Sequence, residues 1–261
     1  MNVLHRSLLS LLLLSGTVMA TDDPFVGKWR FSTKKSNYNG LRIRYEKAGE
    51  HSYKFYDANE VAHEKIADGK EHPGEMGNTY LVRQDNATTW IFITKEPDGT
   101  VLNTTRKVTN NGRTMTATWH DTKPDGKVET GWGEWRRIGS GQGLEGTWEN
   151  TGKGEDNSTT EMVVTPYDSD GLTFSNPSDK EHQSIKFDGK DYPDIGPQVT
   201  KGSVASATRI DSRTIEEIDK IDGRVVDKQE IKVSSDGKTM TQTIHPTTNG
   251  SKTVTNVWER F

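Results

Sequence analysis

The sequence predicts an all-β protein made of two tandem antiparallel up-and-down β-barrels, with about eight to ten strands each. Three observations lead to this fold class. The chain repeats itself once, polar and apolar residues alternate with a period of two, and Asn-Gly or Asp-Gly turn signals separate the alternating runs. No stretch of useful length carries the i, i+3, i+4, i+7 apolar spacing of an amphipathic helix. Strands joined by tight turns therefore account for the chain.

The repeat consists of five short matches that occur in the same order in both halves. The matched segments are 25–29 with 144–148, 69–73 with 189–193, 97–99 with 221–223, 112–116 with 237–241, and 135–136 with 258–260. Ordered matches at nearly constant spacing indicate a tandem duplication. The Gly- and Ser-rich segment 139–143 separates the copies as a linker. We therefore expect one barrel over 21–138 and a second over 144–261.

Alternation and turns predict how the strands of each copy are connected. Residues 114–120 alternate small polar with apolar side chains, and 239–245 repeat this scheme with Met240 and Ile244 on one face. The Asn-Gly and Asp-Gly pairs supply the positive φ that hairpin turns require, so sequential strands pair as a meander. A long open meander would leave two unpaired edges, and closure into a barrel removes them.

The first twenty residues have the form of a secretory signal peptide. His5 and Arg6 precede an apolar run over 8–14, which is too short to span a bilayer, and no later run is apolar enough to do so. The chain has no cysteine, which excludes disulfides and a lipid anchor at the cleavage site. We expect an exported protein, periplasmic or extracellular, without stable membrane insertion.

Composition and motifs exclude several function classes. The net charge is −4, with mixed signs along the chain, which argues against nucleic acid as a partner. The sequence has no nucleophile elbow, phosphate-binding loop or dinucleotide fingerprint, and its seven histidines lack metal-site spacing. It therefore predicts no catalytic residue, no metal and no cofactor, and it leaves protein partners unknown. Glu216, Glu217 and Asp219 are interpreted as a solvated strand face.

The ends of each copy carry a family resemblance. Gly-x-Trp opens both copies, at 27–29 and 146–148, and a Trp/Arg strand closes them, at 135–137 and 258–260. This pattern resembles that of the calycins, which include lipocalins and fatty-acid-binding proteins. The copies are more similar still to uncharacterised exported bacterial lipocalin-like proteins. The chain shows no Arg/Tyr cluster for a carboxylate ligand, so fatty-acid binding is not carried over.

The resemblance implies a structural role for the tryptophans and arginines. In the family, the first-strand tryptophan lies at the closed end of the barrel and the last-strand arginine packs across it. These residues are Trp29 with Arg136 or Arg137 in the first copy, and Trp148 with Arg260 in the second. A desolvated cation–π contact of this kind is worth about 1 to 2 kcal/mol. Any ligand site is then expected at the opposite mouth of the barrel.

Polar residues on inward lanes point to a hydrated interior. Gln242 and Asn256 alternate with apolar neighbours, and unpaired polar groups in a filled core are costly, which favours a wet cavity. The residues that could line such a cavity are Trp90, Trp119, His120 and His245. For the two histidines, a solvated strand end is the simpler interpretation.

The expected function is non-enzymatic binding of a small hydrophobic or amphipathic ligand. Two alternatives remain open at this point. One is a structural or protein-interaction module with filled barrels, and the other is an enzyme of the isomerase or hydrolase type with its site in a barrel cup. The first copy is the better candidate for binding because it is richer in tryptophan.

Overall fold

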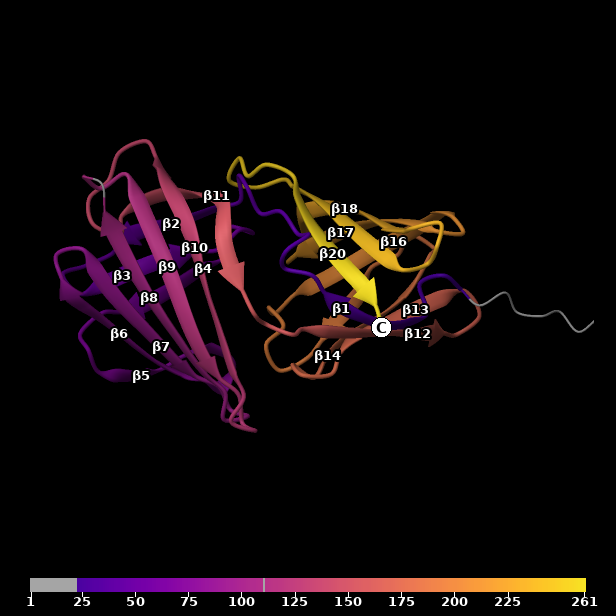
Figure 1. Ribbon diagram of the computed structural model, residues 1–261, viewed down its shortest axis with the longest axis horizontal. Coiled ribbons are helices and arrows are strands. Elements are labelled where there is room, and N and C mark those ends of the chain that lie inside the picture. The colour runs from indigo at the N-terminus through magenta and orange to yellow at the C-terminus, as the bar shows by residue number, and fades with distance from the viewer. Residues whose placement is uncertain (1–22, 110) are drawn as a thin grey trace, which may run out of the picture.

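The computed structural model describes residues 23–109 and 111–261 (Figure 1). The predicted signal peptide, 1–20, lies outside these residues. The described chain contains twenty β-strands and one short 3-10 turn, η1 (Glu75–Gly77), and no α-helix. No helix long and apolar enough to cross a membrane occurs in this part of the chain. The all-β prediction is confirmed, and so is the expected number of strands, because they form two ten-stranded antiparallel sheets.

One sheet, called the open sheet here, is drawn mostly in violet and magenta in Figure 1. Its strands are β2 (Arg42–Lys47), β3 (Ser52–Tyr56), β4 (Ala62–Ile66), β5 (Glu71–Pro73), β6 (Thr79–Asn86), β7 (Thr89–Lys95), β8 (Val101–Thr109), β9 (Thr114–Thr122), β10 (Val128–Ile138) and β11 (Gly146–Asp156). Their order is β4-β3-β2-β11-β10-β9-β8-β7-β6-β5. The sheet curls until it nearly closes, and the backbone N–H of Ile66 donates to the hydroxyl of Tyr80 at 3.1 Å across the gap.

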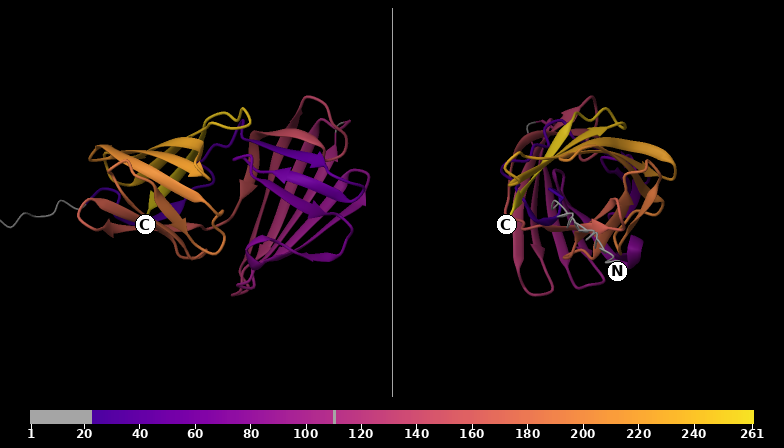
Figure 2. Two further views of the ribbon diagram at one scale, coloured as in Figure 1. Left: turned by 180° about the vertical axis from the view of Figure 1, so that it is seen from behind. Right: turned by 90° about the vertical axis from the view of Figure 1, so that its right-hand side faces the viewer.

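The other sheet is a closed barrel, drawn mostly in orange and yellow and seen along its axis in the right-hand view of Figure 2. Its strands are β1 (Gly27–Phe31), β12 (Glu161–Tyr167), β13 (Gly171–Asn176), β14 (Glu181–Lys186), β15 (Tyr192–Ile195), β16 (Ser203–Asp211), β17 (Thr214–Ile221), β18 (Arg224–Val233), β19 (Thr239–Pro246) and β20 (Val254–Arg260). Neighbours in this order are hydrogen-bonded, and β1 closes the ring between β20 and β12.

The two sequence repeats exchange their first strands. β1 precedes the first repeat's other strands but pairs with β12 and β20, whereas β11 opens the second repeat and pairs with β10 and β2. The expected ranges 21–138 and 144–261 thus mark the sequence repeats, and each sheet takes one strand from beyond its range. The short linker explains the exchange: a connection of this length holds β11 beside β10 as an antiparallel hairpin, so β1 is left to fill the other barrel.

Each sheet has its own hydrophobic core around one fully buried tryptophan. Trp29 anchors the core of the closed barrel and Trp148 that of the open sheet. The lobes contact each other where the β19–β20 loop and the start of β18 meet the start of β2 and the β3–β4 loop. There, Arg224 Nη2 donates to the carbonyl oxygen of Asn59 at 2.9 Å, and the backbone N–H of Arg42 donates to Ser251 Oγ at 2.8 Å.

Candidate functional site

Trp29 and Trp148 are each covered by an arginine, as the resemblance implied, but the partners follow the strand exchange. The Arg260 guanidinium lies 4.2 Å from the ring centroid of Trp29. The Arg137 guanidinium lies 4.1 Å from that of Trp148. Both indole N–H groups donate to a backbone carbonyl four residues earlier, at 2.8 Å. Each indole N–H thus has an acceptor, and each ring face is covered by a guanidinium. Both tryptophan–arginine pairs are therefore interpreted as structural plugs of their sheets.

The structure places Arg136 elsewhere than the plug, and this corrects its expected role. Successive residues of a strand face opposite sides, so when Arg137 covers Trp148, Arg136 points outward. There it pairs with Glu149, which is only 1% exposed and also pairs with Arg42 at 2.9 Å. Glu149 thereby fastens the exchanged strand β11 to its neighbours β10 and β2.

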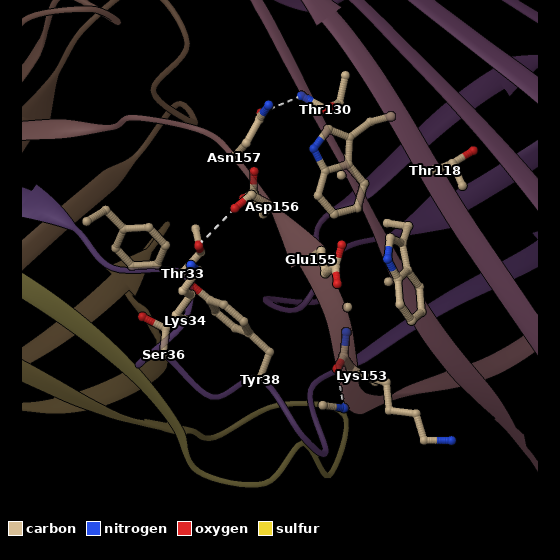
Figure 3. A pocket seen from close by; sticks show the side chains of 18 residues that line it. Thr33, Lys34, Ser36, Tyr38, Thr118, Thr130, Lys153, Glu155, Asp156 and Asn157 are labelled. Atoms are coloured by element: carbon tan, nitrogen blue, oxygen red, sulfur yellow. Dashed lines mark hydrogen bonds between the residues drawn. The ribbon is translucent and has the colours of Figure 1, made fainter.

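A cavity of about 980 Å³ lies between the lobes and is called the interlobe cavity here (Figure 3). Its walls are the segment 31–38, which leads from β1 to β2, and parts of β9, β10 and β11. The aromatic and polar residues that line it include Phe31, Tyr38, Trp119, Trp132, Asn150 and Asp156. Thr33 Oγ1 donates to the carbonyl oxygen of Asp156 at 2.9 Å and ties the two walls together.

Tyr38 connects this cavity to the interior of the closed barrel. Its hydroxyl donates to Asn256 Oδ1 at 2.8 Å, and Asn256 Nδ2 donates to Gln242 Oε1 at 3.0 Å. Burial and the nearby carboxylate of Asp156 raise the pKa of Tyr38 to about 12, so the phenol stays protonated and remains a donor. The inward Gln242 and Asn256 thus satisfy each other.

Of the four residues expected to line a cavity, Trp119 lines the interlobe cavity. Trp90 is 2% exposed and belongs to the hydrophobic core near the Trp148 plug. His120 and His245 are exposed, because each lies next to an inward-facing residue and alternation turns it outward. His245 Nδ1 lies 2.9 Å from Thr253 Oγ1, in keeping with a solvated strand end.

Arg106 on β8 is the central polar group inside the open sheet. Its guanidinium carbon lies 5.2 Å from the ring centroid of Tyr45, 5.5 Å from that of Phe55 and 4.6 Å from that of Phe92. Nη1 donates to the hydroxyl of Tyr45. Nε is buried and has no hydrogen-bond partner, and no acidic side chain pairs with Arg106 among the described residues. Burial lowers the pKa of the guanidinium to about 10.

Strand register places Arg106 next to the interlobe cavity. On the concave face, Thr104 pairs with Trp119 of the cavity wall, and Arg106 pairs with Ala117 one step deeper. Arg106 as a residue keeps intermediate accessibility, but its Nε is buried and the residue is not among those that line the cavity. The guanidinium is therefore an interior group of the open sheet, close to the cavity wall.

This Arg/Tyr arrangement corrects the expectation that the chain lacks one. Phe92 lies on β7, the hairpin neighbour of β8, but Tyr45 and Phe55 come from β2 and β3, which are distant in sequence, so no local spacing reveals the cluster. One local signal was present. Arg106 occupies the same lane of β8 as the buried Val108, and a cation on an apolar lane marks an unusual interior position.

The closed barrel contains an acidic interior where a solvated face was expected. Glu216 is exposed, but Glu217 and Asp219 share the inward face of β17 with the fully buried Ile215. Asp219 pairs across the strands with Asp227 of β18. Burial and mutual repulsion raise the pKa of both Glu217 and Asp219 far above the usual carboxyl range.

Comparisons with known proteins add no family to these observations. No protein-family model matches the chain, and no curated protein matches it. Across 23–109 and 111–261, no group of three or more His, Asp or Glu side chains is arranged to hold a metal ion. The geometry of the two interiors is therefore the basis for assigning a function.

Proposed function

We propose that the protein binds a small amphipathic molecule whose anionic headgroup, a carboxylate, pairs with Arg106 inside the open sheet. The observation that carries this proposal is a buried guanidinium without an acidic partner, surrounded by three aromatic rings. A charge removed from water and left unpaired costs several kcal/mol. A bound carboxylate would supply the missing counter-charge.

The chemistry of the site suits a carboxylate better than a neutral group. A guanidinium presents its N–H donors in a planar fork that matches the two oxygens of a carboxylate. Arg106 Nε is one such donor, and the Tyr45 hydroxyl beside Nη1 can donate a further hydrogen bond to the ligand.

The surroundings suit an apolar tail. Phe55 and Phe92 pack around Arg106, and Trp119, which is in register with Phe92 across β8, lines the interlobe cavity. Sites for small molecules usually enclose about 300 to 1,000 Å³ and combine apolar walls with few polar groups. On this proposal, the interlobe cavity of about 980 Å³ would admit the ligand toward Arg106. The sequence resemblance to exported lipocalin-like proteins and the predicted signal peptide support a role in carrying such a ligand outside the cytoplasm.

The test compares decanoate with decanol, which share a chain and differ in the headgroup. Binding to the full chain is measured by isothermal titration calorimetry, with Arg106→Gln as the variant. Lys107→Gln is the matched control, because it removes one positive charge from the exposed face of the same strand. We expect decanoate to bind the unmodified chain and K107Q alike, and R106Q at least about tenfold more weakly, since a charge-assisted pair is worth about 1.5 to 3 kcal/mol.

Two results would contradict the proposal. Decanol binding as tightly as decanoate would show that the headgroup is not recognised. Equal decanoate affinity in R106Q and K107Q would place the ligand away from Arg106.

A further inference from the structure

Four carboxyl groups gather inside the closed barrel: Asp194 on β15, Glu217 and Asp219 on β17, and Asp227 on β18. Glu217 and Asp227 are only 7% and 8% exposed. No lysine or arginine among the described residues forms an ion pair with any of the four. The interior of this barrel therefore has an acidic character with no basic counterpart.

One oxygen atom of the cluster is a hydrogen-bond acceptor that lacks a donor. Asp227 Oδ1 is buried and has no hydrogen-bond partner. It belongs to the carboxyl group that bonds to Asp219 and whose charge acts on Glu217, so it lies within the cluster. A buried acceptor without a donor costs about 1 to 3 kcal/mol, and more when it is charged. Such an atom points to a donor that the chain itself does not provide.

A ladder of side-chain amides holds the cluster in place. Gln229 Nε2 donates to Asp219, Gln242 Nε2 donates to Gln229, and Asn256 Nδ2 donates to Gln242. Each amide thus donates one N–H hydrogen bond to a side chain on the neighbouring strand. The ladder donates a hydrogen bond to Asp219. It donates none to Asp227 Oδ1 or to the carboxyl group of Glu217.

One of the four carboxyl groups, that of Asp194, lines a cavity of about 320 Å³. Its inward-facing lining residues are Met162, Phe174, Gln183, Asp194, Ser203 and Trp258. Asp194 accepts hydrogen bonds from Gln183 Nε2, at 2.6 Å, and from Ser203 Oγ, and its charge acts on Glu217. The cavity therefore has aromatic walls and an acidic side at Asp194, whose charge also acts on the buried Glu217.

We propose that the closed barrel binds a small organic ammonium ion, a primary amine with an apolar or aromatic tail, at the carboxyl cluster of Glu217, Asp219 and Asp227. This second site is independent of the anion site at Arg106. An ammonium group brings a positive charge and three N–H donors, which the orphaned Asp227 Oδ1 and Glu217 lack. Phe174 and Trp258 would hold the tail and can also attract the cation through their ring faces.

The arrangement favours an ammonium ion over a metal ion. The acidic side chains of the described residues are not grouped in metal-holding geometry. The cavity is instead at the lower end of the size range of small-molecule sites and has the mixed apolar and polar lining that such sites share.

The experiment titrates the full chain with 2-phenylethylamine, and separately with 2-phenylethanol as the uncharged analogue, by isothermal titration calorimetry at neutral pH. The variants are Glu217→Gln and Asp227→Asn, which keep side-chain shape and remove a carboxylate. Glu216→Gln is the matched control because it removes the same charge from the exposed face of β17. Near-ultraviolet circular dichroism verifies that each variant keeps its tertiary structure.

We expect the amine to bind the unmodified chain and E216Q equally, and E217Q and D227N at least about tenfold more weakly. Binding should also release protons, seen as heats that depend on the buffer's ionisation enthalpy, because a cation displaces protons held by the cluster. The proposal is overturned if the alcohol binds as tightly as the amine, if both variants bind like E216Q, or if neither 2-phenylethylamine nor hexylamine binds at millimolar concentration. Arg106→Gln should leave amine binding unchanged, so this site and the anion site can fail separately.

Discussion

The buried acids of the closed barrel make its stability depend on pH in a defined direction. In the folded protein, burial with Asp194 and Asp227 nearby raises the pKa of Glu217 from 4.5 to about 8. Between these two values the folded state holds a proton that the unfolded chain has released. Unfolding therefore releases protons, and the free energy of unfolding falls as pH rises.

The size of the effect follows from the same shift. Stability from this group is fully present below about pH 4.5 and is lost progressively until about pH 8, by about 1.4 kcal/mol per pH unit. Glu217→Gln cannot ionise and removes this slope. The difference between E217Q and the unmodified chain isolates Glu217 from groups elsewhere, such as His63, whose raised pKa produces a slope of the same sign.

Urea unfolding followed by tryptophan fluorescence between pH 5 and pH 8 measures this dependence, with Glu216→Gln as the control. We expect E217Q to gain stability over the unmodified chain as pH rises, and E216Q to run parallel to the unmodified chain. A stability difference between E217Q and the unmodified chain that stays constant with pH would refute the buried, protonated state of Glu217.

Three further predictions concern the plugs and the strand exchange. Glu149→Gln leaves two arginines without their acid and should destabilise the protein by about 3 kcal/mol in urea unfolding; a loss below about 0.5 kcal/mol, the scale of a surface substitution, would contradict this. Arg137→Ala removes the cation over Trp148 and its bonds to three backbone carbonyls, and a loss of about 2 to 4 kcal/mol is expected by the same assay; unchanged unfolding would oppose a structural plug. The third prediction uses the absence of cysteine from the chain. The double variant Lys28→Cys/Val163→Cys places cysteines at paired residues of β1 and β12 and should form an intramolecular disulfide, detected by mass spectrometry after oxidation. Failure of this disulfide to form would argue against the strand exchange.

The sequence was sufficient for the fold class because alternation and turn signals are local. Each Asp-Gly or Asn-Gly pair acts on its own hairpin, and period-two alternation sets the inward face of a strand. The strand exchange was beyond such reasoning. β1 and β11 carry the same Gly-x-Trp motif, so the motif alone does not determine which barrel each strand completes.

The candidate sites were less predictable because they depend on contacts between distant strands. Arg136 and Arg137 are adjacent, and only the register of β10 against β11 shows which of them covers Trp148. Arg106 meets its aromatic neighbours only when the sheet curls. The sequence predicts a solvated position for Glu217 because it lies among other acidic residues. In the structure, Glu217 is on the same face of β17 as the buried Ile215 and points into the barrel.

The two interiors have opposite charge although the copies derive from one repeat. The open sheet buries an arginine without an acid, and the closed barrel buries acids without a base. A duplicated barrel that keeps its plugs and changes its interior can select a different ligand in each copy. The plugs are shared because they close the fold, and, if the two proposed sites are right, the interiors differ because they carry different binding groups.

The central claim is that Arg106 is an anion-binding group, and nuclear magnetic resonance of its side chain tests this most directly. With ¹⁵N-labelled protein, the Nε–H resonance of Arg106, assigned through its loss in Arg106→Gln, is followed during titration with decanoate. We expect it to shift strongly and to saturate with the calorimetric affinity, because Nε gains the partner that it lacks in the free protein. Saturating decanoate binding with no change in this resonance would contradict the claim.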